Sequence, residues 1–344
     1  MTIDGNGTRV ASGRVFRAEG GLAAAEGLIR IGTRGSALAV AQTTTVAEKL
    51  ALATGQDVGL VIVRTKGDVS RESLSQLGGT GVFVSALRDA LLGGECDVAV
   101  HSLKDLPTGD APGIALGAVP ERADARDALC SSEGDLLREL PAGARVGTGS
   151  PRRAAQLLAR RPDLEVLDIR GNVDTRLARL EQDLDAVVLA AAGLDRIGRG
   201  AAIAERFGLA EAPTAPGQGA LAIEVREAEA AGGPLAGRLA AGLAAIEDAV
   251  CRATVLAERQ LLASLEAGCA APVGATAVVA EGLLSLSSTV YRLDGSASLT
   301  ARGDIPWRLD DPDTADAPHE LGRRVAGELL ARGAAELAPL GGRV

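Results

Sequence analysis

The first part of the chain alternates short apolar runs with amphipathic stretches. Residues 28–33, LIRIGT, form an apolar run with the length of a buried strand, and the turn RGS follows them. Residues 37–52 then place their apolar side chains at helical spacing, with Ser36 at the N-cap position. The same alternation continues through residues 57–65, 82–92 and 96–102. This pattern predicts a parallel sheet covered by helices.

The pattern begins again after Arg126. Residues 144–149 have the pattern of a strand, and Ser150 and Pro151 have the residue types of an N-cap and of the first helical position. Further strand and helix segments follow at residues 164–169, 173–181 and 185–193. Residues 215–226, APGQGALAIEVR, are expected to cross back to the first sheet. Two similar α/β domains are therefore predicted.

The last part of the chain has a different pattern. Residues 246–265 form a long amphipathic stretch, and alternating segments follow at 283–293 and 296–302, joined through the turn DGS. A second amphipathic stretch at 320–337 closes the chain. These features predict a small α+β domain.

The predicted fold class is therefore α/β, with two α/β domains and a smaller α+β domain at the carboxyl end. Residues 1–27 are polar and glycine-rich and lack the apolar core of a signal peptide, so we expect them to form a disordered extension. The domains are predicted to comprise residues 28–122 with 215–242, residues 126–214, and residues 246–344.

The overall charge restricts the class of partner. The chain has 36 Lys and Arg against 45 Asp and Glu, a formal net charge of -9. No global positive field would attract nucleic acid or an anionic membrane, and no apolar run has the length of a transmembrane helix. The four cysteines show no CxxC spacing, which indicates the reducing cytoplasm. The basic side chains are expected to act locally.

Arginines gather where predicted strands end and predicted helices begin. In open parallel sheets these loops face the ligand, and helix N-termini there offer unpaired backbone N–H groups. Helix dipoles disfavour cations at such positions, so several arginines there indicate an anion held between them. Five arginines occupy turn or N-terminal positions, and Arg196 lies near a third junction of this kind. The five are Arg34, Arg152, Arg153, Arg170 and Arg176.

Other arginines need no ligand. Arg160, Arg161 and Arg179 are expected to be solvated or paired with nearby acids. For the anion, a polycarboxylate and a polyphosphate are both compatible with the cluster. Carboxylate is favoured, because the chain has no GxxxxGK[ST] loop and because arginine binds carboxylate in bidentate geometry. With only His101 and His319 in the chain, no metal site is indicated.

Five motifs occur in the order and spacing of a known family. They are HSLKDLPT at 101–108, GTGSPRR at 147–153, RGNVDTR at 170–176, APGQGA at 215–220 and EAGCAAP at 266–272. Each motif is weak alone. Together they closely resemble the porphobilinogen deaminase (hydroxymethylbilane synthase) family, and the resemblance runs from about residue 29 to the carboxyl end.

The resemblance implies a transferase of tetrapyrrole (haem) biosynthesis. The family condenses four porphobilinogen molecules head-to-tail into hydroxymethylbilane and releases ammonia at each step. Its fold has two domains like those of periplasmic binding proteins and a third, smaller domain. Every pyrrole ring bears an acetate and a propionate, which would explain a basic groove. A cytoplasmic monomer with porphobilinogen as its small-molecule partner is expected.

The resemblance also implies a covalent dipyrromethane cofactor. Cys269 matches the cysteine that carries this cofactor through a thioether. Its alternative reading is a buried structural thiol, the commoner fate of cysteine outside disulfides. Cys96, Cys130 and Cys251 are expected to be structural thiols of that kind.

Asp105, in HSLKD, matches the catalytic aspartate of the family. Loss of ammonia leaves an electron-poor azafulvene, and formation of the C–C bond makes a cationic pyrrole. A carboxylate that accepts a hydrogen bond from the ring N–H would stabilise that charge and help to move protons. The alternative is an aspartate that caps the following LPT turn.

The remaining motif residues match binding positions of the family. Those matched to contacts with cofactor carboxylates are Lys104, Ser36, Thr148, Ser150, Arg152, Arg153, Arg170 and Arg176. Those matched to substrate binding are Arg34, Arg170, Arg176, Arg196, Gln42, Gln218 and Phe83. For Phe83 a position in the core is an equally compatible reading.

Four positions depart from the usual family motifs. Thr80 replaces a lysine in a glycine-rich loop, and Gly149 replaces a common serine. Ala267 and Ala271 replace a glycine and a branched residue beside the cysteine. These changes retain the thiol and leave catalytic efficiency open.

A non-enzymatic two-domain binder of a carboxylate-rich small molecule is the alternative function. Paired α/β domains with an anion site also describe solute-binding proteins. The mass of the intact protein distinguishes the two, because only the enzyme carries a covalent dipyrrole.

Overall fold

The computed structural model divides the chain into two compact units. Unit 1 comprises residues 1–122 and 220–249, and unit 2 comprises residues 123–219 and 250–344. The predicted second and third domains thus fall in one unit, and their division stays a prediction. None of the helices in the described part is long and apolar enough to cross a membrane. The structure describes residues 2–3, 9–10, 13–18, 20–63, 81–109, 111–230, 236–268, 271–309 and 311–340.

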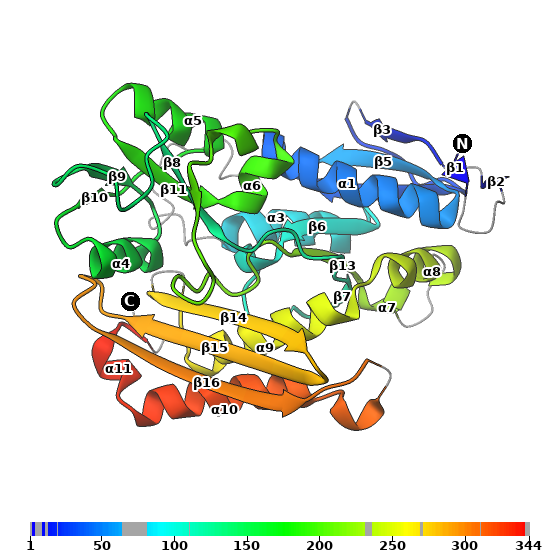
Figure 1. Ribbon diagram of the computed structural model, residues 1–344. Helices are drawn as coiled ribbons and strands as arrows, with labels where there is room; N and C mark the ends of the chain where they lie inside the picture. Colours follow the sequence, from blue (N-terminus) through cyan, green and yellow to red (C-terminus); the bar gives the residue numbers. More distant parts are fainter. Residues whose placement is uncertain are drawn as a thin grey trace. The chain divides into compact units, whose positions relative to one another are not determined.

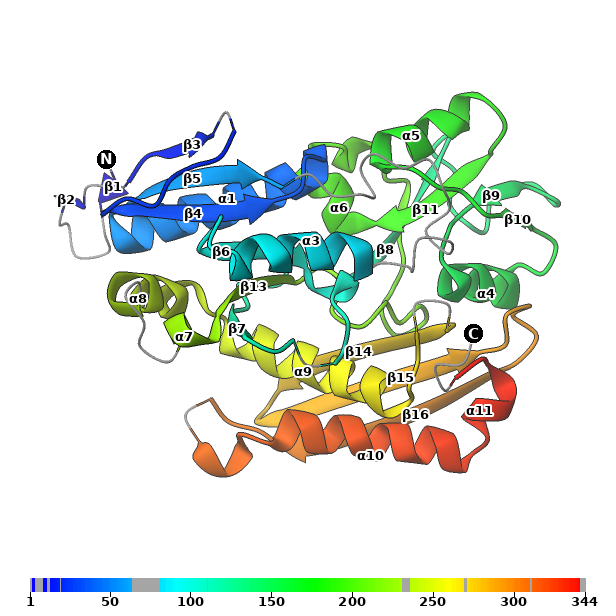
Figure 2. The same cartoon turned by 180° about the vertical axis from the view of Figure 1, so that it is seen from behind.

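Unit 1 is built on a six-stranded sheet with the strand order β3-β5-β4-β6-β13-β7 (Figures 1 and 2; β4 is labelled in Figure 2). The strands are β3 (Val15–Arg17), β4 (Leu28–Thr33), β5 (Asp57–Ile62), β6 (Val98–Ser102), β7 (Ile114–Ala118) and β13 (Leu221–Arg226). The first four strands of that order run parallel, as predicted. The all-parallel expectation is wrong for β13, which is antiparallel to β6 and β7. The chain returns at the carboxyl end of β6, where the Leu103 N–H donates to the Ala220 carbonyl, so β13 runs in the opposite direction.

Helices cover both faces of this sheet. They are α1 (Ala37–Thr54), α3 (Gly81–Leu92), α7 (Glu227–Ala230) and α8 (Ala236–Ile246). Helices α1 and α8 pack on one face, where Ile31, Leu50 and Leu243 share a core. Helix α3 packs on the other face through Leu87. Ser36 caps α1 as predicted, since its side chain accepts the Ala39 N–H at 3.3 Å.

The predicted disordered extension is wrong for part of its length. Val15–Arg17 form β3, which pairs with β5 as an edge strand, and the Arg14 guanidinium meets Asp57 at 2.7 Å. A run of three residues is too short to show a period-2 pattern, so no strand could be predicted there. Two shorter strands, β1 (Thr2–Ile3) and β2 (Arg9–Val10), form an antiparallel pair.

Unit 2 contains a five-stranded sheet with the order β10-β9-β11-β8-β12. Its strands are β8 (Asp127–Ser131), β9 (Arg145–Gly147), β10 (Glu165–Leu167), β11 (Ala186–Ala190) and β12 (Glu205–Arg206). Strands β9, β10 and β11 are parallel, whereas β8 is antiparallel to β11. The helices are α4 (Pro151–Arg160), α5 (Val173–Leu177) and α6 (Ala191–Arg196), with 3-10 turns at Ala178–Glu181 and Gly200–Ala202. The helix predicted over 173–181 therefore changes to a 3-10 turn after Leu177.

Alternate residues of β11 enter two different cores. Val188 packs with Leu157 of α4 on one face, and Leu189 packs with Leu194 of α6 on the other. This arrangement confirms the predicted α/β class for this part of the chain. It also leaves the turns after β9, β10 and β11 at one edge of the sheet.

A three-stranded antiparallel sheet completes unit 2. It comprises β14 (Val273–Ala280), β15 (Leu283–Tyr291) and β16 (Ser298–Pro306). Helices α9 (Ala249–Ser264) and α10 (Ala317–Ala331) cover one face, as Figure 2 shows, and a 3-10 turn (Pro312–Thr314) precedes α10. The predicted closing helix breaks, because Gly333 has a φ of 91° and separates α10 from α11 (Ala334–Leu337).

The loop before β13 is fastened to this last sheet by a buried carboxylate. Glu258 of α9 accepts the Gly217 N–H at 2.7 Å and the Ala277 N–H at 2.9 Å. Gly217 has a φ of 76° and Gly219 a φ of 87°, which glycine adopts without strain. Gln218 is therefore held between two turns that its neighbours fix.

Candidate functional site

In unit 1 the candidate residues follow the carboxyl ends of two neighbouring strands. Arg34 and Ser36 follow β4, and Lys104 and Asp105 lie in a 3-10 helix (Leu103–Asp105) directly after β6. Because β4 and β6 are adjacent and parallel, the two turns share one edge of the sheet. Lys104 is exposed and Asp105 is half-buried. This edge of the sheet thus carries a cation and a carboxylate on two consecutive residues.

Gln42 has its side-chain amide engaged inside unit 1. It lies buried on α1, and its Nε2 donates to Ser102 Oγ at 2.9 Å. The Ser102 hydroxyl lies 3.3 Å from Gln42 Oε1, so it can donate in return. This pair holds Ser102, the residue just before the Leu103–Asp105 turn. The substrate contact expected for Gln42 stays a prediction.

In unit 2 the candidates follow three parallel strands. Thr148 and Ser150 follow β9 and lead into α4, Arg170 and Arg176 follow β10, and Arg196 ends α6 after β11. The Ser150 hydroxyl accepts the N–H of the third residue of α4 at 3.4 Å, which confirms the predicted cap. Thr148 Oγ1 accepts the Ser150 N–H at 3.3 Å. The sequence pattern therefore brings these polar groups to one edge.

The Arg176 guanidinium lies close enough to those of Arg153 and Arg170 for their charges to repel it, while Asp168 offsets part of this effect. Burial lowers the pKa of Arg176, and the positive charges of Arg153 and Arg170 lower it further. The Arg176 Nε donates to the Gly171 carbonyl at 2.8 Å, and Arg170 pairs with the exposed Asp168 at 3.0 Å. Like charges in one place are costly, so this cluster indicates a site for an anionic ligand.

Arg196 lies apart from that repulsion. Its pKa is lowered by burial, and its Nη2 donates to the Gly219 carbonyl at 2.7 Å. This contact joins α6 to the loop that carries Gln218. A role in chain elongation stays a prediction.

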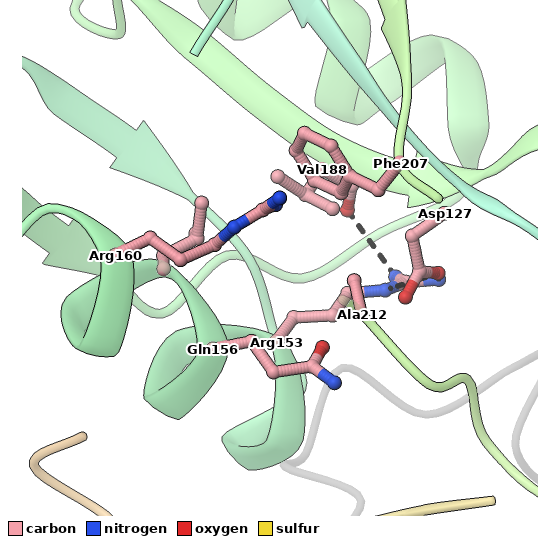
Figure 3. A pocket seen from close by; sticks show the side chains of 8 residues that line it. Asp127, Arg153, Gln156, Arg160, Val188, Phe207 and Ala212 are labelled. Carbon is pink, nitrogen blue, oxygen red and sulfur yellow. Dashed lines mark hydrogen bonds and ion pairs between the residues drawn. The ribbon is translucent and has the colours of Figure 1, made fainter. Parts of the chain in front are cut away.

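Arg152 and Arg153 point into the interior of unit 2, onto Asp127 at the start of β8. Arg152 Nη1 donates to Asp127 Oδ2 at 2.7 Å, and Arg153 Nη2 donates to Asp127 Oδ1 at 2.7 Å. Figure 3 shows Arg153 facing Asp127, with its Nη1 directed to the Val188 carbonyl at 3.2 Å. All three charged residues are buried. Contacts of these two arginines with cofactor carboxylates stay a prediction.

The cavity beside this cluster is too small for a pyrrole ring. It has a volume of about 10 Å³ and is lined partly by Asp127, Arg153 and Gln156 (Figure 3). A cavity of that size holds about one water molecule. Arg160 lies over the ring of Phe207 at 5.3 Å on the same side. The ligand site therefore lies elsewhere than in this cavity.

Gln218 also faces Asp127. Its Nε2 donates to Asp127 Oδ1 and to the Ala125 carbonyl, both at 2.8 Å, and its Oε1 accepts from Arg153 at 3.3 Å. The sequence reasoning missed Asp127 altogether. Its only local signal is an acid that opens an apolar strand, whereas its partners come from distant segments.

Asp127 stays ionised despite its burial. Burial alone raises the pKa of the carboxyl, but the guanidiniums of Arg152 and Arg153 lower it by more, well below the ordinary range. Burial, in turn, is the largest effect on Arg152 and lowers its pKa. Because the pKa of Asp127 is lowered, the ionised carboxylate stabilises the fold fully at pH values above the ordinary pKa of aspartate. This stabilisation is lost as the pH falls through the lowered pKa, in strong acid.

Replacing Asp127 with asparagine is expected to lower the free energy of unfolding by about 3–5 kcal/mol, since it leaves two buried guanidiniums without a counter-charge. Urea unfolding measures the change. The matched control is Asp163→Asn, which removes a partner of Arg161 at 2.6 Å on the surface of the same unit and should cost at most about 1 kcal/mol. Equal losses in the two variants would contradict the interpretation of Asp127 as the central charge.

Several predicted residues lie outside the described part of the chain. Cys269 and Thr80 do, and Phe83 is described only through the backbone of α3. The other three cysteines are buried, as predicted: Cys96, Cys130 and Cys251. Burial raises the pKa of Cys96 and of Cys130 to about 11.

Three of the four departing positions have a structural context. A Cβ atom at Gly149 would lie 2.7 Å from the Ile169 carbonyl oxygen, so a serine there would require a backbone shift. Ala267 and Ala271 are partly buried against the core of the last sheet. Among the described residues, no group of three His, Cys, Asp or Glu side chains could hold a metal ion.

Comparisons with known proteins agree over most of the chain. Residues 29–232 match the sequence profile described as "Porphobilinogen deaminase, dipyromethane cofactor binding domain", and residues 252–331 match "Porphobilinogen deaminase, C-terminal domain". The chain is 61% identical to the porphobilinogen deaminase of Leifsonia xyli subsp. xyli over 319 residues, covering 92% of this chain and 96% of the relative. It is 51% identical to that of Thermobifida fusca, covering 90% and 95%.

Solved structures with a similar arrangement are much more distant. The immunogenic lipoprotein A of Vibrio vulnificus is 10% identical, with a TM-score of 0.39, covering 65% of this chain and 96% of that one. A periplasmic binding protein of Salmonella typhimurium with high arginine specificity is 13% identical, with a TM-score of 0.34, covering 63% and 92%. These likenesses carry no argument about the site.

Proposed function

Because the chain belongs to the porphobilinogen deaminase family, we propose that Asp105 performs its proton and charge chemistry and that the arginine cluster binds its carboxylates. The protein is a transferase of tetrapyrrole biosynthesis with a dipyrromethane cofactor. It deaminates four porphobilinogen molecules and joins them head-to-tail into hydroxymethylbilane. A non-enzymatic binder is not supported, since relatives matched over nine-tenths of the chain are enzymes by name.

The single observation that carries the site proposal is the half-buried Arg176 after β10, whose Nε donates to the Gly171 carbonyl at 2.8 Å and whose charge is repelled by the guanidiniums of Arg153 and Arg170. A ligand that is dense in carboxylates would relieve that repulsion. Porphobilinogen bears an acetate and a propionate, and the bidentate geometry of guanidinium suits both groups.

The donors of unit 2 fit a dipyrromethane group, which carries the same acids. Arg170, Arg176, Thr148 and Ser150 would hold its acetates and propionates. When bound, dipyrromethane supplies the primer pyrrole to which substrate units are added.

Cys269 is the proposed attachment point. The thiolate is the reactive form of cysteine, and burial raises the pKa of Cys96 and of Cys130 to about 11. Cys251 is buried as well. These three thiols are therefore poor nucleophiles, which supports attachment at the fourth.

Asp105 is proposed to hold and move a proton at its carboxylate. In each cycle the C–N bond of the aminomethyl group breaks and ammonia leaves with a proton. A C–C bond then forms at the free α-carbon of the chain end, which loses its hydrogen as a proton. Asp105 would give the first proton and accept the second, and as an anion it would stabilise the positive charge between the two steps.

Replacing Arg176 with glutamine should test the proposed carboxylate contacts. A charge-assisted hydrogen bond contributes about 1.5–3 kcal/mol, so we expect the KM for porphobilinogen to rise about 10-fold or more and the cofactor-loaded fraction to fall. Steady-state kinetics and intact-protein mass measure these effects. The control is Arg160→Gln, at an exposed arginine over Phe207, which should change neither quantity. If the two variants behave alike, the cluster does not bind carboxylates.

The chain is further proposed to act as a monomer in the cytoplasm. In the part of the chain that the structure describes, Cys96, Cys130 and Cys251 form no disulfide, which suits a reducing compartment. Each unit buries its own apolar cores, so neither needs a partner chain to cover them.

A further inference from the structure

The strand that ends at the Lys104–Asp105 turn is held from both faces of the sheet of unit 1. Consecutive residues of a strand point to opposite faces, so His101 and Ser102, the last residues of β6, face different helices. Ser102 meets Gln42 of α1 at 2.9 Å. His101 faces the side of α3, where a buried group that the reaction has not so far used lies next to it.

That group is Glu224 of β13. Its carboxylate accepts hydrogen bonds from Arg88 of α3, the shortest of them at 3.0 Å from Nε to Oε2 and at 2.6 Å from Nη2 to Oε1. His101 Nε2 lies 3.2 Å from Glu224 Oε2, at ion-pair distance but outside the angles of an ideal hydrogen bond. Register places Glu224 opposite Ala99, diagonal to His101 on the same face of the sheet.

Glu224 thereby ties three elements together: α3, β6 and β13. It is 4% exposed and His101 is 6% exposed, so water cannot replace either partner readily. Burial raises the pKa of Glu224, and the contacts with His101 and Arg88 offset this and lower the pKa to about 2. The carboxylate is therefore a fixed anion throughout the neutral range.

The contact lies close to the start of the reactive turn. The ladder between β6 and β13 pairs Ser102 with Leu221 and ends where the Leu103 N–H donates to the Ala220 carbonyl at 3.1 Å. The next two residues are Lys104 and Asp105. A shift of His101 would therefore displace the backbone that follows it and, with it, the carboxylate of Asp105.

We propose that Glu224 is a positioning residue for turnover, which acts through His101 to fix the end of β6 and the place of Asp105. The proposal rests on the role proposed above for Asp105. Glu224 touches no substrate in this scheme, so its removal should alter the rate of the chemical step more than the binding of substrate.

The test compares Glu224→Gln with Asp97→Asn in cofactor-loaded enzyme. Asp97 is a matched control, because it is buried at the opposite end of β6 and pairs with Arg30 at 2.6 Å. Both variants should lose stability in urea. Only Glu224→Gln should lower kcat, by about 10-fold or more at a KM within twofold, as a small misplacement of a reacting group does. Equal kcat values for the two variants would overturn the proposal.

A second variant keeps the test valid if Glu224→Gln does not fold. His101→Asn leaves the Arg88–Glu224 pair in place and should show the same fall in kcat, so a normal kcat would overturn the proposal. Asp105→Asn is assayed alongside. If Asp105→Asn is slow while Glu224→Gln matches Asp97→Asn, only the positioning proposal fails. If Asp105→Asn turns over normally, the role of Asp105 itself is wrong.

Discussion

Replacing Asp105 with asparagine lowers kcat for hydroxymethylbilane formation by about 10²–10⁴-fold and leaves the covalent cofactor attached. The magnitude is that of a positioned general acid–base group, together with the stabilisation of a positive charge that a neutral amide does not supply. Asparagine has nearly the same shape as aspartate, so the Leu103–Asp105 turn should keep its conformation. The loss should therefore appear in kcat rather than in folding.

Ammonia release and product formation, each divided by the cofactor-loaded protein, measure this effect. The control is Asp89→Asn, at an exposed carboxylate on α3 in the same unit, which should leave kcat unchanged. Turnover of Asp105→Asn within a fewfold of the unchanged enzyme would remove Asp105 from the mechanism.

Replacing Cys269 with serine abolishes both the attachment of dipyrromethane and the formation of product. A serine hydroxyl is scarcely ionised at neutral pH, whereas a thiol of ordinary pKa, about 8.5, supplies some thiolate. The buried thiols cannot substitute, because the pKa of Cys96 and of Cys130 is raised to about 11. Without a tethered primer, the arginine cluster has nothing to hold the growing chain in place.

The control for this loss is Cys130→Ala, which removes a buried thiol of unit 2 and should keep the cofactor and the activity. The Ehrlich colour reaction on denatured protein, which detects pyrroles, compares the two variants. Full activity of Cys269→Ser would place the attachment elsewhere.

Local signals in the sequence predicted the elements that carry the site. Ser36 and Ser150 were recognisable as N-caps from the residues beside them, and the structure gives each the expected hydrogen bond. Those caps mark the ends of β4 and β9, so the edges that carry the arginines could be predicted. The strand β3 could not be predicted, because three residues are too few to show a period. The break at Gly333 could not be predicted either, because a glycine inside a helical pattern does not always end the helix.

The interior contacts of the site residues were beyond sequence reasoning. Arg153 was expected to face a ligand, but Asp127 and Gln218, which accept from its guanidinium, lie far away in the sequence. Glu224 and His101 meet only because β13 pairs antiparallel with β6. Such partners depend on which strands are neighbours, and that order is set by packing and not by any local pattern.

The mass of the intact, denatured chain, compared between the natural sequence and Cys269→Ser, tests the covalent primer most directly. The account predicts that the natural chain exceeds its polypeptide mass by two linked pyrrole units and that Cys269→Ser shows the polypeptide mass alone. A bare natural chain that still turns over porphobilinogen would contradict it, and so would the same added mass on Cys269→Ser.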